Sequence, residues 1–334
     1  MADEGEWGAG LWAMADLATP LAVRVAATLR IADHIAQGLQ TDRELAEAVN
    51  ADADALDRVL RHLTTVGVLI RNGSGGYALT ARGDALRDDH PHRMRARLDI
   101  GGAVGRADLS FVQLLHTVRT GRPAYPAQFG HSFWEDVASD AALSASFDAL
   151  MGCDVAAEAP AIVSAYDWGS LGHVVDVGGG NGSLLIALMK AYPILSGTVV
   201  DLPGAVEAAR EALAPAGFAY RSDVVAGSFF DPLPPGAGGY LLSAIVHNWD
   251  DEAARTILRR CAEAAGANGA VFVVERIGVD GESPSTEMDL RMLAYFGGRE
   301  RGLAELTALA ADSGLKVAAV HAAEANSIVE LTAL

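Results

Sequence analysis

The sequence predicts two parts of different fold class: a mainly helical N-terminal part and a C-terminal α/β part built on a parallel sheet. In the first part, apolar residues recur at helical spacing and a short glycine-rich turn follows the helices. In the second part, short valine-rich runs alternate with helical stretches. A chain of 334 residues also exceeds the usual size of one hydrophobic core, so two domains are expected.

The N-terminal pattern is mainly helical over residues 11–165. Thr41 followed by Glu44 is a capping-box signature, which predicts that a helix begins there. A further helix is predicted over 54–69 and a tight glycine-rich hairpin over 71–79. An earlier helix carries apolar residues at helical spacing, namely Leu17, Leu21, Val25, Leu29 and Ile31. Three helices followed by a hairpin are the element order of a winged helix.

The C-terminal pattern predicts seven strands, over 173–177, 197–202, 220–226, 239–247, 270–276, 316–321 and 327–334. Helices are predicted in most of the intervals, for example over 183–191, 205–213, 251–265 and 303–313. Such alternation indicates a parallel sheet with helices on both faces. The last two strands are joined by only a few residues, too few for a crossover helix, so they are expected to form an antiparallel hairpin.

The composition disfavours several classes of partner. With 25 basic against 43 acidic residues the formal net charge is -18, whereas a nucleic-acid surface needs Lys and Arg to displace counterions. No apolar stretch approaches the roughly 20 residues of a membrane helix. The N-terminus is acidic rather than basic as in a signal peptide, and Cys153 and Cys261 form no CxxC pair. We therefore expect a cytoplasmic protein without nucleic-acid or membrane partners.

The most specific motif is the loop Asp176-Val177-Gly178-Gly179-Gly180-Asn181-Gly182, between a predicted strand and a predicted helix. Glycines let the backbone turn tightly and bring main-chain N–H groups close to a ligand. The spacing differs from the G-x-G-x-x-G of dinucleotide enzymes, which favours a ligand without a pyrophosphate and disfavours a dehydrogenase. The Asp176 carboxylate would either favour a positive charge on the ligand or simply orient the turn.

Asp201 ends the second predicted strand, in Val199-Val200-Asp201. A carboxylate about 20 residues beyond a glycine loop is placed to accept hydrogen bonds from ribose hydroxyls. The loop and the carboxylate together indicate an adenosine ligand. The alternative is that Asp201 only caps the following helix.

His247 lies at the end of the fourth predicted strand, and the carboxyl ends of parallel strands are where chemistry takes place in open α/β sheets. A histidine can accept the proton of a phenol during group transfer, although it can equally cap a helix or satisfy the core. Glu275 ends the buried fifth strand and Glu300 follows a glycine pair. A buried glutamate needs a partner, and a carboxylate beside an imidazole fixes its tautomer and stabilises its protonated form.

A metal site is a second interpretation of this region, because Asn248, Asp250 and Asp251 directly follow His247. Asp250 and Asp251 precede a predicted helix, where acidic residues cap the free N–H groups and complement the dipole. The sequence therefore predicts no metal.

With these residues in place, the chain resembles the plant-type small-molecule O-methyltransferases, and most closely the actinobacterial members that methylate aromatic polyketides such as anthracyclines and naphthoates. The resemblance runs from the segment Asp16-Leu17-Ala18-Thr19-Pro20 to Leu334 and includes Gly227-Ser228-Phe229-Phe230-Asp231-Pro232-Leu233-Pro234. It implies a winged-helix dimerisation domain at 1–100, a helical connection lining the substrate pocket at 101–165, and a class I methyltransferase domain with a Rossmann-like sheet at 166–334.

The resemblance also implies the cofactor and the residues of the site. S-adenosylmethionine, which becomes S-adenosylhomocysteine, is expected to contact Asp176, Gly178, Gly180, Asp201, Gly227, Ser228, Phe229 and Ser243. Within this set, Ser228 and Phe229 match the surroundings of the adenine, and Ser243 matches the methionyl end. His247 matches the general base, and Glu275 and Glu300 match the carboxylates that flank it. The aromatic acceptor is expected to contact Trp12, Met151, Asp154, Asn248, Met292 and Phe296.

Three residues depart from the family pattern. Ser228 stands where many relatives have aspartate, so the adenine amino group is contacted differently. Asn248 stands where plant members often have aspartate, which suggests a neutral donor to a quinone or phenol oxygen. Trp12 occupies the position of an early arginine that can hold a carboxylate in the naphthoate enzymes, which favours a polycyclic acceptor without a carboxylate.

The helical part has two possible functions: it forms a homodimer, or it binds DNA as part of a regulator. Trp7, Trp12 and Met14 fall outside any periodic helix, and an apolar early segment of this kind needs a partner. The helix that would read DNA carries only Arg58, Arg61 and His62 as basic groups, and it has Asp54 and Asp57 beside them. The sequence therefore predicts a homodimeric enzyme that methylates a phenolic hydroxyl of a small aromatic compound.

Overall fold

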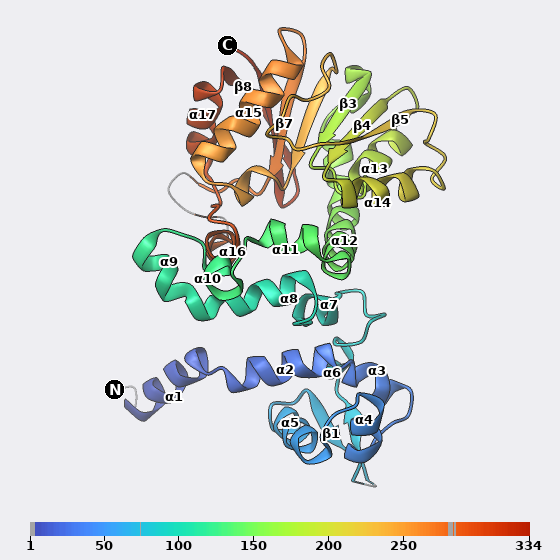
Figure 1. Ribbon diagram of the computed structural model, residues 1–334, viewed down its shortest axis with the longest axis vertical. Helices are drawn as coiled ribbons and strands as arrows, with labels where there is room; N and C mark the ends of the chain where they lie inside the picture. The colour runs from blue at the N-terminus through green and yellow to red at the C-terminus, as the bar shows by residue number, and fades with distance from the viewer. Residues whose placement is uncertain (1–3, 74, 280–282, 284) are drawn as a thin grey trace. The chain divides into compact units, whose positions relative to one another are not determined.

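The computed structural model describes residues 4–334 except 74, 280–282 and 284, and for residues 4–9 it describes the backbone only. The chain divides into two compact units, Met1–Leu109 and Ser110–Leu334 (Figure 1). Each unit has a hydrophobic core of its own. Among the described residues, no helix combines the length and the apolar character that crossing a membrane requires.

The N-terminal unit consists of helices and one short hairpin, in the order α1 (Glu4–Ala15), α2 (Ala18–Thr28), α3 (Ile31–Ala36), α4 (Asp42–Ala48), α5 (Ala53–Thr65), β1 (Leu69–Arg71), β2 (Tyr77–Leu79), α6 (Ala81–Asp84), α7 (Met94–Leu98) and α8 (Ala103–Asp108). The predicted capping box is confirmed, because Glu44 N–H donates to the Thr41 hydroxyl and the Glu44 carboxylate accepts from Thr41 N–H. The strands β1 and β2 pair antiparallel, as the glycine-rich turn predicts. The core of this unit includes Ile31, Leu45, Leu60, Leu63 and Tyr77.

One prediction for this unit was wrong in detail. The helix expected over 54–69 ends at Thr65, because Gly67 adopts a φ of 72° and Leu69, itself buried in the same core, begins a strand. Trp7, Trp12 and Met14 were predicted to lie outside any periodic helix, and they lie in α1, whose apolar residues do not gather on one side. The sequence of α1 is apolar on all sides, so it shows no one-sided periodicity. The side chain of Trp7 lies outside the described residues.

The C-terminal unit begins with helices: η1 (Leu109–Gln113, its first residue in the other unit), α9 (Leu114–Thr120), α10 (Ala124–Phe129), α11 (Phe133–Ser139), α12 (Ala141–Ala165) and η2 (Trp168–Leu171). The sheet follows, with β3 (His173–Val177), β4 (Ser196–Asp201), β5 (Ser222–Ala226), β6 (Gly239–Ser243), β7 (Ala270–Glu275), β8 (Leu315–Ala323) and β9 (Asn326–Ala333). Its helices are α13 (Ser183–Ala191), α14 (Pro203–Leu213), η3 (Val246–Asn248), α15 (Asp251–Ala265), α16 (Thr286–Tyr295) and α17 (Leu303–Asp312).

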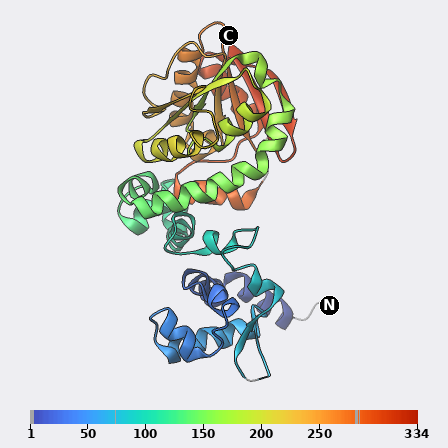
Figure 2. The same cartoon turned by 90° about the vertical axis from the view of Figure 1, so that its right-hand side faces the viewer.

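The sheet has the order β5-β4-β3-β6-β7-β9-β8. Its first five strands are parallel, and β9 pairs antiparallel with both β7 and β8, so the predicted parallel sheet with a terminal antiparallel hairpin is confirmed. Alternate strand residues point to opposite faces. One face packs on α15 and α17 and the other on α12 and α13, as Figures 1 and 2 show for this unit.

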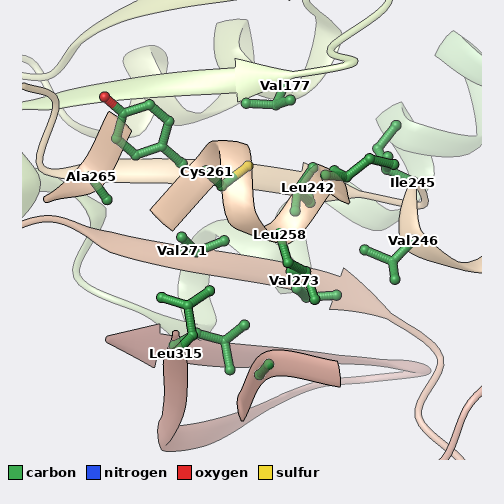
Figure 3. Close-up of a cluster of buried hydrophobic side chains, with 14 of the residues drawn as sticks. Val177, Leu242, Ile245, Val246, Leu258, Cys261, Ala265, Val271, Val273 and Leu315 are labelled. Carbon is green, nitrogen blue, oxygen red and sulfur yellow. The ribbon is translucent and has the colours of Figure 1, made fainter. Parts of the chain in front are cut away.

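Figure 3 shows the first of these layers, in which side chains from the sheet and from α15 interdigitate. Val177, Leu242 and Val273 come from neighbouring strands, and Leu258 and Cys261 come from the helix. Ile245 and Val246 continue the same cluster beyond the end of β6. This apolar anchoring fixes the segment that carries His247 to the carboxyl edge of the sheet.

The strand predicted over 239–247 was too long. It ends at Ser243, and His247 lies on the one-turn helix η3. Ala244 departs from extended geometry with a φ of 54°, a left-handed conformation that is unusual for alanine. The apolar run continues past the strand because Ile245 and Val246 are buried in the core, so hydrophobicity alone cannot locate the end of β6.

Candidate active site

The glycine loop joins β3 to α13, as the sequence predicts, and its backbone requires glycine. Gly178, Gly180 and Gly182 have φ values of 72°, 54° and 73°, in the left-handed region. A Cβ on Gly178 would lie 2.6 Å from the Ile245 side chain, so a larger residue would displace that side chain as well as strain the backbone. A Cβ on Gly180 would meet no heavy atom within 4 Å. The main chain at Gly180 is therefore open to a ligand.

Asp201 connects the end of β4 to this loop. Its carboxylate accepts the Gly180 N–H at 2.8 Å and the Leu202 N–H at 2.7 Å. Burial raises the pKa of Asp201, and the two N–H donors oppose that rise. The following helix has Leu202 as its N-cap, and no described side chain caps it. The helix-capping alternative is therefore wrong, and Asp201 instead fixes the glycine loop beside the strand end where a ribose would bind.

Asp176 is a buried carboxylate next to the loop. The residue is 2% exposed, and its Oδ2 atom has no hydrogen-bond partner within the part of the chain that the structure describes. Burial, reinforced by the charge of Asp201, raises the pKa of Asp176 to about 7. An orphaned buried carboxylate is costly unless a donor or a cation approaches it. The residues at this position therefore fit a ligand that carries positive charge, as a sulfonium amino acid does.

The loop after β5 reaches the same place. The ring of Phe229 comes within 3.4 Å of the position that a Cβ on Gly178 would take. Gly227 precedes it on the chain, and the Ser228 hydroxyl accepts the Phe230 N–H at 3.2 Å, which shapes the turn. Ser243, half-buried, ends β6 at the same carboxyl edge of the sheet. The structure thus brings the predicted cofactor residues of four strands to one edge.

Helix α12 passes over the glycine loop. A Cβ on Gly152 would lie 2.5 Å from the Asn181 amide, so the helix and the loop are in close contact. Met151 and Asp154, predicted to contact the substrate, flank this glycine and are half-buried. Asp148, one turn earlier, was missed by the sequence analysis. Burial, followed by the charge of Asp201, raises the pKa of Asp148, so it belongs to the same group of carboxylates.

His247 and the two predicted glutamates come together, but the glutamates have different roles. The ring Nδ1 of His247 lies 2.9 Å from Oε1 of Glu300. Oε1 of Glu275 instead accepts the backbone N–H of His247, at 3.0 Å. The expectation that both carboxylates contact the imidazole is therefore wrong. Glu300 orients the ring, and Glu275 holds the backbone of His247. Both glutamates are buried, with exposed fractions of 7% and 5%.

The electrostatics of His247 follow from these contacts. Burial lowers the pKa of His247, but the hydrogen bond to Glu300 and the charges of Glu275 and Glu300 outweigh it, so the pKa is raised overall. Burial likewise raises the pKa of Glu275. A carboxylate at Nδ1 favours the tautomer in which Nδ1 carries the proton, which leaves the lone pair on Nε2. Nε2 can then accept a proton from a bound hydroxyl group.

The polar residues that follow His247 are engaged within the turn. The Asn248 amide donates to the Ala244 carbonyl at 3.0 Å, so this amide stabilises the turn. Asp250 accepts the Ala253 N–H at 2.9 Å, and its predicted role as a helix cap is confirmed. Asp251 pairs with Arg301 at 2.8 Å. Over the described ranges, no three His, Cys, Asp or Glu side chains gather in a metal-ligating group.

Aromatic side chains that the sequence analysis missed lie beside Phe296 and the His247 turn. The Trp134 ring stacks on Phe296, with centroids 5.2 Å apart and planes at 13°, and on Trp249 at 6.3 Å and 15°. The indole Nε1 of Trp134 is buried and has no partner among the described atoms. Nothing in the sequence distinguishes Trp134 from an ordinary core aromatic. Met292, predicted to contact the substrate, is buried on α16 nearby in the chain.

One predicted substrate residue belongs to the other unit. Trp12 lies on α1 and is 71% exposed, in company with Leu11 and Met14. Its assignment to the substrate stays a prediction.

Comparison with known families identifies both parts of the chain. Residues 12–89 match the O-methyltransferase dimerisation domain, and residues 111–316 match the O-methyltransferase domain. Among curated relatives, 2,7-dihydroxy-5-methyl-1-naphthoate 7-O-methyltransferase of Streptomyces carzinostaticus is 59% identical over 97% of this chain and 98% of its own length. Aclacinomycin 10-hydroxylase RdmB of Streptomyces purpurascens is 47% identical over 96% of this chain and 89% of its own length.

Solved structures agree with this assignment. NcsB1, an O-methyltransferase from neocarzinostatin biosynthesis crystallised with S-adenosylmethionine and 2-hydroxy-5-methyl naphthoic acid, has a TM-score of 0.94 at 58% identity, covering 97% of this chain and 98% of its own. TnmH has the same TM-score of 0.94 at 38% identity, over the full length of both chains. The chain belongs to the plant-type O-methyltransferase family and is an S-adenosylmethionine-dependent O-methyltransferase.

Proposed function

We propose that this enzyme methylates a phenolic hydroxyl of a naphthoate-type or larger polycyclic aromatic compound, with His247 as the general base. The observation that carries the base assignment is the 2.9 Å contact between Nδ1 of His247 and the buried Glu300 carboxylate. It favours the tautomer in which Nδ1 carries the proton and Nε2 carries the lone pair. The acceptor class rests on relatives whose names refer to a dihydroxy-methyl-naphthoate and, in a bound complex, to a hydroxy-methyl naphthoic acid.

The cofactor residues proposed are those that gather at the carboxyl edge of β3 to β6. Gly180 presents open main chain, Gly178 gives the loop its left-handed turn, and Asp201 is placed for the ribose hydroxyls. Asp176 provides negative charge for the cationic part of the ligand. Phe229 packs beside Gly178, where an adenine ring needs an apolar face. When bound, S-adenosylmethionine supplies the methyl group from its sulfonium centre.

The protein's chemical contribution is then to hold the hydroxyl and to remove its proton. A phenol has a pKa near 10 in water, far above that of histidine, so proton removal has to accompany methyl transfer. Glu300 in contact and the nearby charge of Glu275 stabilise the imidazolium that results. General-base help of this kind is worth about 10²–10⁴-fold. No metal has a part in the proposed reaction.

The acceptor is proposed to lie against apolar and aromatic side chains. The stacked rings of Phe296 and Trp134 provide aromatic surface, and Met292 and Met151 provide adaptable thioethers suited to an aromatic ring. Trp12 in place of a carboxylate-binding arginine predicts that a polycyclic acceptor without a carboxylate is preferred to a naphthoic acid. Asn248 remains a candidate donor to a second oxygen through the amide hydrogen that Ala244 does not use.

The enzyme is proposed to be a homodimer that associates through its N-terminal domain. The match to a dimerisation domain over 12–89 supports this, as do the exposed apolar side chains at the start of the chain. Leu11, Trp12, Met14 and Leu17 have exposed fractions of 69%, 71%, 86% and 60%. A patch of this kind in a globular protein indicates an interface. Light scattering that finds a monomer of full activity at micromolar concentration would contradict the dimer. We also propose three functional segments: a dimerisation domain at 1–100, a helical connection that lines the substrate pocket at 101–165, and a methyltransferase domain at 166–334.

The decisive experiment incubates the enzyme with S-adenosylmethionine carrying a deuterated methyl group and a panel of hydroxynaphthoates, hydroxyquinones and flavonoids. Mass spectrometry should find a methyl ether that has gained the intact labelled methyl group, with unchanged yield when a chelator is present. The relative RdmB is named as a hydroxylase, so the product is also checked for a gained oxygen atom. Oxygen incorporation without the label would contradict the proposal.

A further inference from the structure

We propose that Arg301 is a positioning residue for methyl transfer, because its guanidinium clamps the turn that carries His247. The inference rests on the proposed role of His247 as base. Arg301 touches neither the imidazole nor the proposed ligand residues, so it would act only through the geometry of the turn.

The turn and the clamp are two segments far apart in the chain, Val246–Asp251 and Gly298–Arg301. They are in close backbone contact, since a Cβ on Gly298 would lie 2.2 Å from the His247 carbonyl oxygen. The Arg299 N–H donates to that same oxygen at 2.9 Å. Glu300, the next residue, reaches the imidazole. The segment that orients the ring is thus also bonded to the backbone of the ring's own residue.

Arg301 completes this arrangement from a buried position. It is 2% exposed, and its guanidinium donates to the Val246 carbonyl at 2.9 Å and to the Trp249 carbonyl at 2.8 Å. Two further hydrogen bonds, of 2.8 and 3.2 Å, reach the Asp251 carboxylate. One side chain therefore holds carbonyl groups on both sides of His247. Only a planar fork of several donors can satisfy three separated acceptors, and the ammonium of lysine cannot match that geometry.

The turn needs such support because regular structure does not provide it. β6 has already ended, η3 spans only Val246–Asn248, and Ala244 holds a left-handed conformation. Strained residues persist only where their surroundings over-determine them. If the turn relaxed by about 1 Å, catalysis could fall by about 10²-fold, because the base would lose its alignment with the acceptor.

The test measures kcat, KM for the cofactor and melting temperature for Arg301→Lys, alone and combined with His247→Ala. Arg301→Lys should lower kcat by about 10- to 10²-fold with KM for S-adenosylmethionine nearly unchanged. In the His247→Ala background it should lower kcat no further, because the residue acts only through the imidazole. Equal losses of kcat in both backgrounds would overturn the proposal and leave Arg301 a merely structural residue.

Two further variants keep the result interpretable. Asp251→Asn removes the charge partner of Arg301 on a side chain that is 44% exposed, so it should fold and show a smaller loss of kcat with the same non-additivity. Arg255→Gln is the matched control, because Arg255 lies on the same helix as Asp251 and forms an exposed pair with Asp312 of α17 at 3.0 Å. This variant should retain full kcat. If His247→Ala by itself leaves kcat intact, the proposed base is wrong. If Asp251→Asn and Arg301→Lys both retain full kcat, the proposed positioning role of Arg301 is wrong, and the role of His247 as base is unaffected.

Discussion

The imidazole of His247 and the carboxylate of Glu300 are joined by a 2.9 Å contact that spans 53 positions of the chain. The Glu300 side chain is 3% exposed and that of His247 18%, so water screens the pair little. The contact determines which ring nitrogen is available, and it contributes to the raised pKa of His247.

Replacing Glu300 by glutamine should lower the pKa that governs the rate. Burial lowers the pKa of His247 and the Glu300 contact is the largest influence that raises it, so its loss shifts the pKa downward. Because only neutral imidazole can accept the proton, kcat/KM should rise with pH through this pKa and then flatten. In Glu300→Gln the rise should occur at lower pH, with a reduced plateau. A profile identical to that of the wild type would contradict the assignment.

His247→Ala should lower kcat by about 10²–10⁴-fold, the usual contribution of a general base. Cofactor affinity, measured by calorimetry, should stay nearly unchanged, because Asp201 is hydrogen-bonded to the glycine loop and His247 is hydrogen-bonded to Glu300. The loss should be largest for acceptors of high pKa, since an acidic hydroxyl ionises without help. His321→Ala serves as a control, because that histidine pairs with Glu330 on the β8–β9 hairpin. Near-normal turnover of the His247 variant on a weakly acidic phenol would refute the base.

Glu275→Gln should have a smaller effect on kcat than Glu300→Gln. Glu275 accepts a backbone N–H, and the amide oxygen of glutamine can take the same hydrogen bond. The lost charge should still lower the pKa of His247, because the charge of Glu275 is one of the influences that raise it. The comparison of the two plateau rates at high pH is therefore decisive. A larger loss in Glu275→Gln would mean that the backbone contact matters more than the ring contact.

The fold could be predicted because its signals are local. The alternation of valine-rich runs and helices gave β3 and α13 with the bounds that the structure has, and the short last connection gave the β8–β9 hairpin. The end of β6 could not be predicted in the same way. Ile245 and Val246 are as apolar as strand residues, and they are buried in the same core although the strand has ended.

The candidate site could be predicted as a set of residues but not as a set of contacts. His247, Glu275 and Glu300 were identifiable by type and by position at strand ends. Which oxygen meets which nitrogen depends on the path of Gly298–Arg301, some 50 positions away, and no local pattern encodes that path. For the same reason Arg301 and Trp134 gave no signal in the sequence.

Asp201→Ala should weaken S-adenosylmethionine binding by about 1–3 kcal/mol, the cost of losing a charged hydrogen-bond partner. Because the carboxylate also accepts the Gly180 N–H, the variant should release the glycine loop and slow cofactor association as well. At saturating cofactor, kcat should change far less. Asp223→Ala, an exposed aspartate on the neighbouring strand β5, is the matched control. Calorimetry that finds unchanged affinity would show that β4 does not carry a ligand group.

The buried Asp176 should make both stability and cofactor affinity depend on pH, in opposite directions. Burial raises the pKa of Asp176 to about 7, whereas an aspartate in the unfolded chain titrates near 4. Between about pH 4 and pH 7 the folded protein therefore binds more protons at this site than the unfolded chain does. Protonation of Asp176 therefore favours the folded state at low pH, and this contribution to the free energy of unfolding is lost as the pH rises through this window.

Asp176→Asn should separate the two effects, because the amide is similar in shape and cannot ionise. The free enzyme should melt at a higher temperature than the wild type at about pH 8, where the wild type holds an orphaned carboxylate, and the two should converge at about pH 5. Binding should respond in the opposite sense. Wild-type affinity for S-adenosylmethionine should rise with pH through about 7 as the carboxylate forms, and the asparagine variant should lose that rise. S-adenosylhomocysteine, which lacks the sulfonium charge, should bind with an affinity that depends less on pH in both proteins.

Titration calorimetry with both ligands at about pH 6 and pH 8 measures these affinities. Asp223→Asn controls for the loss of an acidic side chain at the same sheet. Equal pH dependence for the two ligands would place the charge of Asp176 away from the sulfonium, and a flat profile for both would mean that the carboxylate only orients the turn.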